Sequence, residues 1–200
     1  MRLSDSRYEE IKQTIADFLE DYNVSKLPVD VFDLAEKLGI RIVRATELIK
    51  KNKGQIDENF IFTLPNSFLH VDNQAQKIII YLDDVGTKRN RQRFSIAHEI
   101  LHIILEHTEQ TPRNESEANF GAIYLLAPTS LVLIPESLNY LDDFVFVQRV
   151  FGVSEQTADI AVRYNLNRLL CLSSKPKKYE ITINSLFKDS LISHVNKHDC

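Results

Sequence analysis

Residues 98–102 read HEILH and place two histidines and a glutamate inside a strongly apolar segment. In a helix, side chains four residues apart lie on one face, so His98 and His102 can present two imidazole nitrogens to one cation. Glu99 lies one position further round, where its carboxylate can take a proton from a water molecule. Burying such groups without partners costs several kcal/mol each, and a cation would compensate for that cost. The pattern H-E-x-x-H predicts a zinc site with Glu99 as the general base.

A zinc site needs a third protein ligand, and the residues after His102 limit where it can come from. One zinc signature has Gly three residues and His six residues after the second histidine, but Leu105 and Thr108 occupy these positions here. His107 is nine residues from His98, about 180° round a continuous helix, so we expect it to face away from the ion and into solvent. The third ligand must come from another segment.

The next helical segment, ESEANFGAIYLLAP over residues 115–128, offers two carboxylates, Glu115 and Glu117. We favour Glu115 as the ligand because Asn119 shares its helix face, where an amide can orient a metal-bound imidazole. Either acid can instead serve only as a favourable charge near a helix N-terminus. Small residues at helical spacing would let this helix approach the histidine helix closely, namely Ala118, Gly121 and Ala122.

These two segments resemble a known family. RQRFSIAHEILH (residues 91–102) followed by residues 115–128 is similar to the ImmA/IrrE metallo-endopeptidases, whose pattern runs R-F-T-x-A-H-E-x-x-H and then E-x-E-A-N/D with L-L-x-P. PVDVFDLAEKLGIRIV (residues 28–43) resembles the N-terminal helix and first strand of the family. FGVSEQTADIAVRYNL (residues 151–166) resembles its C-terminal helical segment. The resemblance covers most of residues 7–170.

The resemblance implies a zincin-like α+β domain that binds zinc through His98, His102 and a glutamate of E-x-E-A-N, with Glu99 as the general base. It also implies the substrate class, which is helix-turn-helix repressors of mobile elements or of stress responses. The chain departs from the family pattern at Leu101, where the family often has glycine, and at Gly121, where an aromatic residue is usual. These departures concern the shape of the cleft more than metal binding.

The elements around these motifs also predict an α+β fold. Apolar residues between turns over 54–83, in runs such as ENFIFTLP (58–65), are typical of a small, mostly antiparallel sheet. We predict a zincin-like metallopeptidase domain over 1–134, a helix-turn-helix-like segment over 135–172 packed on it, and a linker and tail over 173–200, the tail being a strand or a short helix. Predicted helices cover residues 7–22, 28–39, 88–107, 113–127, 136–150 and 154–170, and a strand covers 40–45.

Composition limits the class of protein further. Two hundred residues with 44% hydrophobic content suffice for one compact domain with a small appendage. No run of about 18 apolar residues exists and the N-terminus lacks an apolar signal segment, so we expect a cytoplasmic protein without a membrane partner. Cys171 and Cys200 are the only cysteines, which argues against a disulfide framework.

The expected partner is a protein substrate. A net charge of −4, with Arg149 and Arg163 as the only basic residues of 147–164, disfavours direct DNA binding by the helix-turn-helix-like segment. The alternative to an enzyme is a non-catalytic, zinc-stabilised module that binds a repressor or DNA. Glu99 favours the enzyme, because a structural zinc site needs no base. Candidate donors to a reaction oxyanion are Tyr81, Tyr124 and Tyr140.

Overall fold

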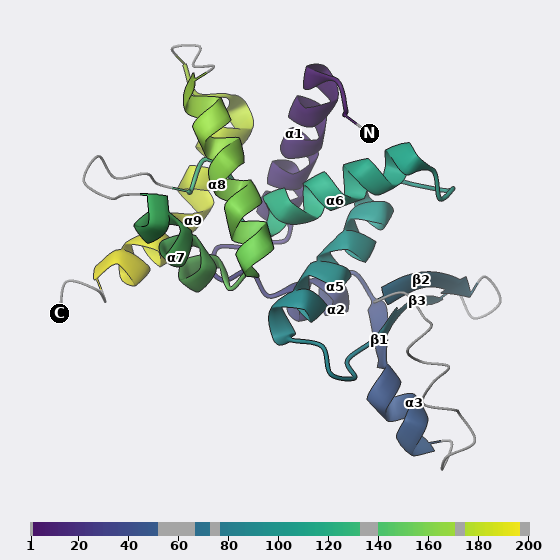
Figure 1. Ribbon diagram of the computed structural model, residues 1–200. Helices are drawn as coiled ribbons and strands as arrows, with labels where there is room; N and C mark the ends of the chain where they lie inside the picture. The colour runs from purple at the N-terminus through teal and green to yellow at the C-terminus, as the bar shows by residue number, and fades with distance from the viewer. Residues whose placement is uncertain (1, 52–66, 73–76, 133–139, 171–174, 197–200) are drawn as a thin grey trace.

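The computed structural model describes residues 2–51, 67–72, 77–132, 140–170 and 175–196, which form the predicted α+β arrangement (Figure 1). The predicted apolar run 58–65 lies outside the described residues. In chain order the elements are α1 (Asp5–Asp21), α2 (Val31–Lys37), β1 (Ile40–Arg44), α3 (Ala45–Lys51), β2 (Ser67–Asp72), β3 (Lys77–Leu82), α5 (Arg89–Ile104), α6 (Pro112–Leu126), α7 (Tyr140–Phe151), α8 (Glu155–Leu170) and α9 (Lys178–Asn196).

The three strands in the described residues form a mixed sheet of order β1-β3-β2. β3 pairs in parallel with β1, Ile40 opposite Ile78, and antiparallel with β2, Ser67 opposite Leu82. The sheet predicted as mostly antiparallel thus contains one pair of each kind. Parallel pairing is possible because the chain leaves β1 through α3 and returns through β2 before it enters β3. Apolar alternation specifies which face of a strand is buried, not the direction of its neighbour.

Helix α5 lies at the centre of the molecule, with the sheet on one side and α6, α7, α8 and α9 on the other (Figure 1). It contacts β2 and β3 on one side and α2 and α6 on the others. Ile96, Ala97, Ile100 and Leu101 have no exposed surface, as expected for a helix that is apolar almost all the way round. The motif residues of α5 are therefore held by a rigid, buried element.

The predicted pair of helices at 136–150 and 154–170 is present as α7 and α8, which pack on each other. Gly152 forms the turn between them with a φ of +59°, a conformation that glycine adopts without strain. Ala158, Ala161 and Val162 are fully buried, so one face of α8 packs in the hydrophobic core.

The C-terminal tail, predicted as a strand or a short helix, forms the 19-residue helix α9. α9 packs on α1, where the Tyr179 hydroxyl donates to the Glu9 carboxylate at 2.9 Å. Ile183 and Phe187 are fully buried. The weak apolar alternation of the tail did not identify this helix, because the side of α9 that is buried is set by its contact with α1.

No helix within the described ranges is both long and apolar enough to cross a membrane. The proposed domain boundaries stay a prediction.

Candidate metal centre

Helix α5 presents two imidazoles on one face. The Nε2 atoms of His98 and His102 lie 3.0 Å apart, as their four-residue spacing predicts for side chains one turn apart. The His98 and His102 side chains are 15% and 10% exposed, so they border a cleft without being free in solvent. The remaining partner of this pair comes from α6.

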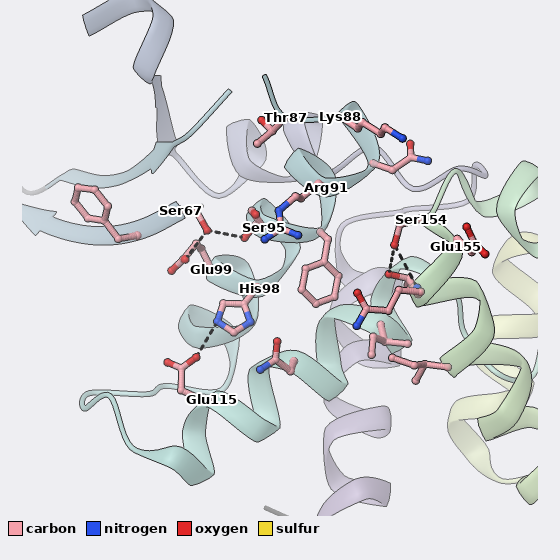
Figure 2. A pocket seen from close by; sticks show the side chains of 18 of the residues that line it. Ser67, Thr87, Lys88, Arg91, Ser95, His98, Glu99, Glu115, Ser154 and Glu155 are labelled. Carbon is pink, nitrogen blue, oxygen red and sulfur yellow. Dashed lines mark hydrogen bonds and ion pairs between the residues drawn. The ribbon is translucent and has the colours of Figure 1, made fainter. Parts of the chain in front are cut away.

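Glu115 lies in the first turn of α6, where Thr111 caps the helix by accepting a hydrogen bond from the N–H of Asn114. The two carboxylate oxygens of Glu115 lie 3.3 Å from Nε2 of His98 and 3.4 Å from Nε2 of His102. Figure 2 shows the Glu115 side chain pointing at His98 across the gap between the two helices. Among the described residues these three form one cluster that could hold a metal ion.

The spacing of the three side chains fits a metal ion. Four ligands in a tetrahedron around an ion at about 2.0–2.1 Å stand about 3.3 Å from one another. The observed separations of 3.0, 3.3 and 3.4 Å match that edge length. Within the part of the chain that the structure describes, two imidazoles and one carboxylate leave a fourth position, a ligand count typical of catalytic zinc sites, whereas structural zinc sites usually have four protein ligands.

Both imidazoles are held neutral, which leaves their lone pairs available. Burial, followed by the neighbouring His98, lowers the pKa of His102 to about 4. Burial also lowers the pKa of His98, against the Glu115 carboxylate and the adjacent Asn119 side chain, which raise it. Asn119 therefore lies beside the imidazole that it was predicted to orient. A metal ion would not compete with protons for these nitrogens near neutral pH.

Glu99 lies on the same cleft but makes a different contact. Its side chain is buried, and Oε1 accepts a hydrogen bond of 2.8 Å from the hydroxyl of Ser67, the first residue of β2 (Figure 2). Burial raises the pKa of Glu99, and the Ser67 hydrogen bond opposes that rise. A carboxylate with a raised pKa is suited to exchange a proton near neutral pH. Ser67 was missed because nothing in its local sequence marks it as the partner of a residue 32 positions away.

Glu117, the other acid considered as a ligand, points away from the cluster. It is buried, 2% exposed, and its carboxylate accepts from Arg7 at 2.6 Å and from Arg113 at 3.0 Å. Burial alone would raise the pKa of Glu117, but hydrogen bonds from Arg7, Arg113 and His107 outweigh it and lower the pKa to about 2. The geometry therefore favours Glu115 over Glu117 as the side chain beside the histidines.

The prediction that His107 faces solvent is wrong. Its side chain is only 5% exposed, and its Nδ1 lies 3.1 Å from Nδ1 of His102. The prediction assumed that the helix continues to residue 107, whereas α5 ends at Ile104 and Glu106 adopts a φ of +55°. This turn folds His107 back under the helix. No glycine marks the turn, so the usual sequence signal of a helix end was absent.

The three residues of the candidate metal site and Glu99 line a cleft of about 1170 Å³. It extends from them to the start of α8, where Ser154 and Glu155 line its other wall (Figure 2). Thr157 of α8 also lines the cleft. The volume exceeds that of a typical small-molecule pocket, so a segment of a polypeptide can fit. The helix pair α7–α8 thus borders the cleft instead of standing apart from it.

None of the three tyrosines considered as oxyanion donors is among the described residues that line this cleft. The Tyr81 ring stacks on Phe68 with centroids 4.7 Å apart, and Tyr124 is buried in the core. Tyr140 begins α7, and its side chain lies outside the described part of the structure. The geometry supports neither Tyr81 nor Tyr124 in that role.

Comparison with known proteins agrees with this geometry. The family model Peptidase_M78, described as the IrrE N-terminal-like domain, matches residues 35–163, which is well over half of the chain. The match includes β1, α5, α6 and most of α8, and therefore all the residues of the cluster. No curated protein matches the chain.

Proposed function

The chain belongs to the peptidase M78 (IrrE N-terminal-like) family, as its resemblance to the ImmA/IrrE proteins predicted, and from this premise we propose that it is a zinc-dependent endopeptidase. The observation that carries the proposal is the cluster of His98, His102 and Glu115 beside the buried carboxylate of Glu99 in one cleft. We also propose that residues 1–134 form a zincin-like domain, that the substrate is a cytoplasmic helix-turn-helix repressor of a mobile element or a stress response, and that cleavage occurs in the cytoplasm.

His98, His102 and Glu115 would hold the zinc, a gluzincin-like set of two histidines and one glutamate. Two neutral imidazoles and a carboxylate are ligands that zinc prefers. When bound, zinc supplies Lewis-acid chemistry: it polarises a carbonyl oxygen and lowers the pKa of water. The neutral state of both imidazoles supports this assignment, because protonated histidines cannot ligate.

Glu99 moves the proton in the reaction that we propose. Its carboxylate takes a proton from the attacking water and delivers it to the nitrogen of the leaving amine as the peptide bond breaks. Ser67 holds the carboxylate from the adjacent strand. General bases of this kind contribute about 10²- to 10⁴-fold to rate, so the loss of Glu99 should remove most turnover without removing a metal ligand.

The direct test is to incubate the purified zinc-loaded protein with the helix-turn-helix repressor encoded nearest to it, and to look for fragments by mass spectrometry. We expect cleavage that a chelator abolishes and that added zinc restores. Full binding of the repressor by zinc-loaded protein, with no fragment formed, would instead support the alternative of a module that sequesters a repressor.

Three variants complete the test. Glu99→Gln should keep stoichiometric zinc and lose cleavage, whereas His102→Ala should lose both. Glu109→Gln, which changes an exposed acid outside the cleft, should cleave like the unmodified protein. Cleavage at the normal rate by Glu99→Gln would refute the general-base assignment, and stoichiometric zinc in His102→Ala would refute the ligand set.

A further inference from the structure

The turn that ends α5 places a third imidazole, that of His107, against the Nδ1 side of the His102 ring. The N–H of His107 bonds to the carbonyl of His102 at 2.9 Å, and the N–H of Glu106 bonds to the carbonyl of Ile103 at 3.0 Å. With Glu106 at positive φ, these two bonds form a Schellman motif. In this motif the second residue after the C-cap, which is Leu105 here, packs against the residue five positions before it. Here that contact joins the two imidazoles, whose Nδ1 atoms are 3.1 Å apart.

The directions of the hydrogen bonds around His107 follow from the position of the cluster. Nε2 of His102 faces His98 and Glu115, so a metal ligand there needs its lone pair on Nε2 and its proton on Nδ1. That proton is donated to Nδ1 of His107, which must accept. His107 then carries its own proton on Nε2, which lies 3.2 Å from a carboxylate oxygen of Glu117 and donates to it.

We propose that His107 is a positioning residue that fixes His102 in the Nδ1–H tautomer and so prepares its Nε2 for the metal. The inference rests on the proposed metal site. It extends the common arrangement in which a carboxylate orients a ligand histidine, because here a second histidine is inserted between the carboxylate and the ligand.

The far end of this chain of hydrogen bonds is firmly held. Arg7 and Arg113 both donate to Glu117, so its carboxylate stays an acceptor for His107. The side chains of Glu117 and His107 are 3% and 5% exposed, which keeps water from replacing either contact. Arg7 belongs to α1, outside the residues 35–163 that match the family model. The N-terminal helix therefore contributes to the environment of the candidate ligand.

His98 has a different neighbour. The Asn119 side chain lies beside its ring, and within the described residues its Nδ1 contacts no histidine–carboxylate pair like the one behind His102. The two ligand imidazoles thus differ: His102 is held by the buried network of His107 and Glu117, whereas His98 is not part of that network. This difference means that removing His107 acts on one ligand alone, which makes the inference testable.

The test measures zinc affinity directly, by competition with a chromophoric chelator, in variants of the full chain. His107→Leu removes the acceptor and should weaken zinc binding by about 10- to 100-fold. His107→Asn places an amide oxygen near the position of Nδ1, so it should bind zinc more tightly than His107→Leu. His70→Leu, which removes an exposed histidine of β2, is the matched control and should leave affinity unchanged.

The outcomes separate the two proposals. If the unmodified chain binds no zinc, the proposed function fails; if it binds zinc and His107→Leu binds it equally well, only the role of His107 fails. Should His107→Leu not fold, ¹⁵N NMR of the unmodified, zinc-free chain decides. We expect the proton of His102 on Nδ1 and that of His107 on Nε2. The opposite tautomer of His102 would overturn the inference.

Discussion

Three ionisable side chains in the middle of an apolar helix would each cost several kcal/mol if they were charged and without partners. His98 and His102 avoid this cost by staying neutral, since burial lowers both pKa values. Glu99 reduces it through the hydrogen bond from Ser67, and its pKa is raised by burial. At the residue scale, burial thus keeps both imidazoles neutral and able to bind a metal ion, and the Ser67 hydroxyl supplies a partner for the buried Glu99 carboxyl.

Replacing Ser67 with alanine should raise the pKa of Glu99 further in the metal-free protein. The lost hydrogen bond favours the carboxylate, so its removal favours the protonated acid. The side-chain ¹³C resonance of Glu99, followed against pH, measures the change. For a carboxyl group with a raised pKa in the folded state, stability is lost as pH rises through that pKa, so Ser67→Ala should also enlarge the total loss of stability and extend it to higher pH. Ser193→Ala, on exposed α9 surface, is the control, and an unchanged Glu99 titration in Ser67→Ala would contradict the assignment.

At the scale of elements, the site depends on how closely α5 and α6 approach, because one contributes two imidazoles and the other the carboxylate. The two positions where the chain departs from the family pattern lie in contact at this interface. A Cβ atom on Gly121 would stand 2.5 Å from Cδ1 and 2.7 Å from Cγ of Leu101, which is fully buried. The bulk of Leu101 thus fills the space that a side chain at position 121 would take.

We expect Gly121→Ala to lower the free energy of unfolding by about 1–3 kcal/mol, because the fully buried Leu101 side chain would have to shift to make room for the added Cβ. In the Leu101→Ala background the same substitution should instead stabilise the protein by up to about 1 kcal/mol, since alanine is the better helix former. Denaturant unfolding of the four proteins of this double-mutant cycle measures both effects. Equal effects of Gly121→Ala in the two backgrounds would show that the two side chains do not compete for this space.

At the scale of the whole molecule, helices outside the family match complete the structure. α1 packs on α6 and α9, and its Arg7 reaches Glu117 behind the candidate metal centre. Buried residues of α9, among them Ile183 and Phe187, belong to the same hydrophobic core as Ile100 of α5. Helices α1 and α9 are therefore packed into the same core as the helix that carries the histidines.

We expect Phe187→Ala to lower the free energy of unfolding by about 3–5 kcal/mol, as for other large buried aromatic residues. Because α9 shares the core, zinc release and loss of helical circular dichroism should move together to lower denaturant concentration. Ile181→Ala, at a position of α9 that is 58% exposed, should have little effect. If zinc release kept its normal midpoint while part of the helical signal was lost early, α9 would be an independent appendage, as the predicted tail over 173–200 implied.

Features that depend on local spacing along the chain could be predicted without a structure. The four-residue interval of His98 and His102 fixed their shared face, and apolar residues all round α5 predicted its burial. The glycine-centred turn before α8 and the helical class of most segments follow from the same local rules. The family motif also lies within one continuous stretch, so the family was visible without a structure.

Contacts between groups that are distant along the chain could not be predicted in this way, because they depend on how the elements pack. The choice between Glu115 and Glu117 depends on the angle between α5 and α6 and on Arg7, 110 residues from Glu117. The Ser67 contact depends on sheet position, and the place of His107 on a helix end without glycine. Residue types and local periodicity do not predict such distant pairs, because the contacts form only when hydrophobic burial packs the elements together.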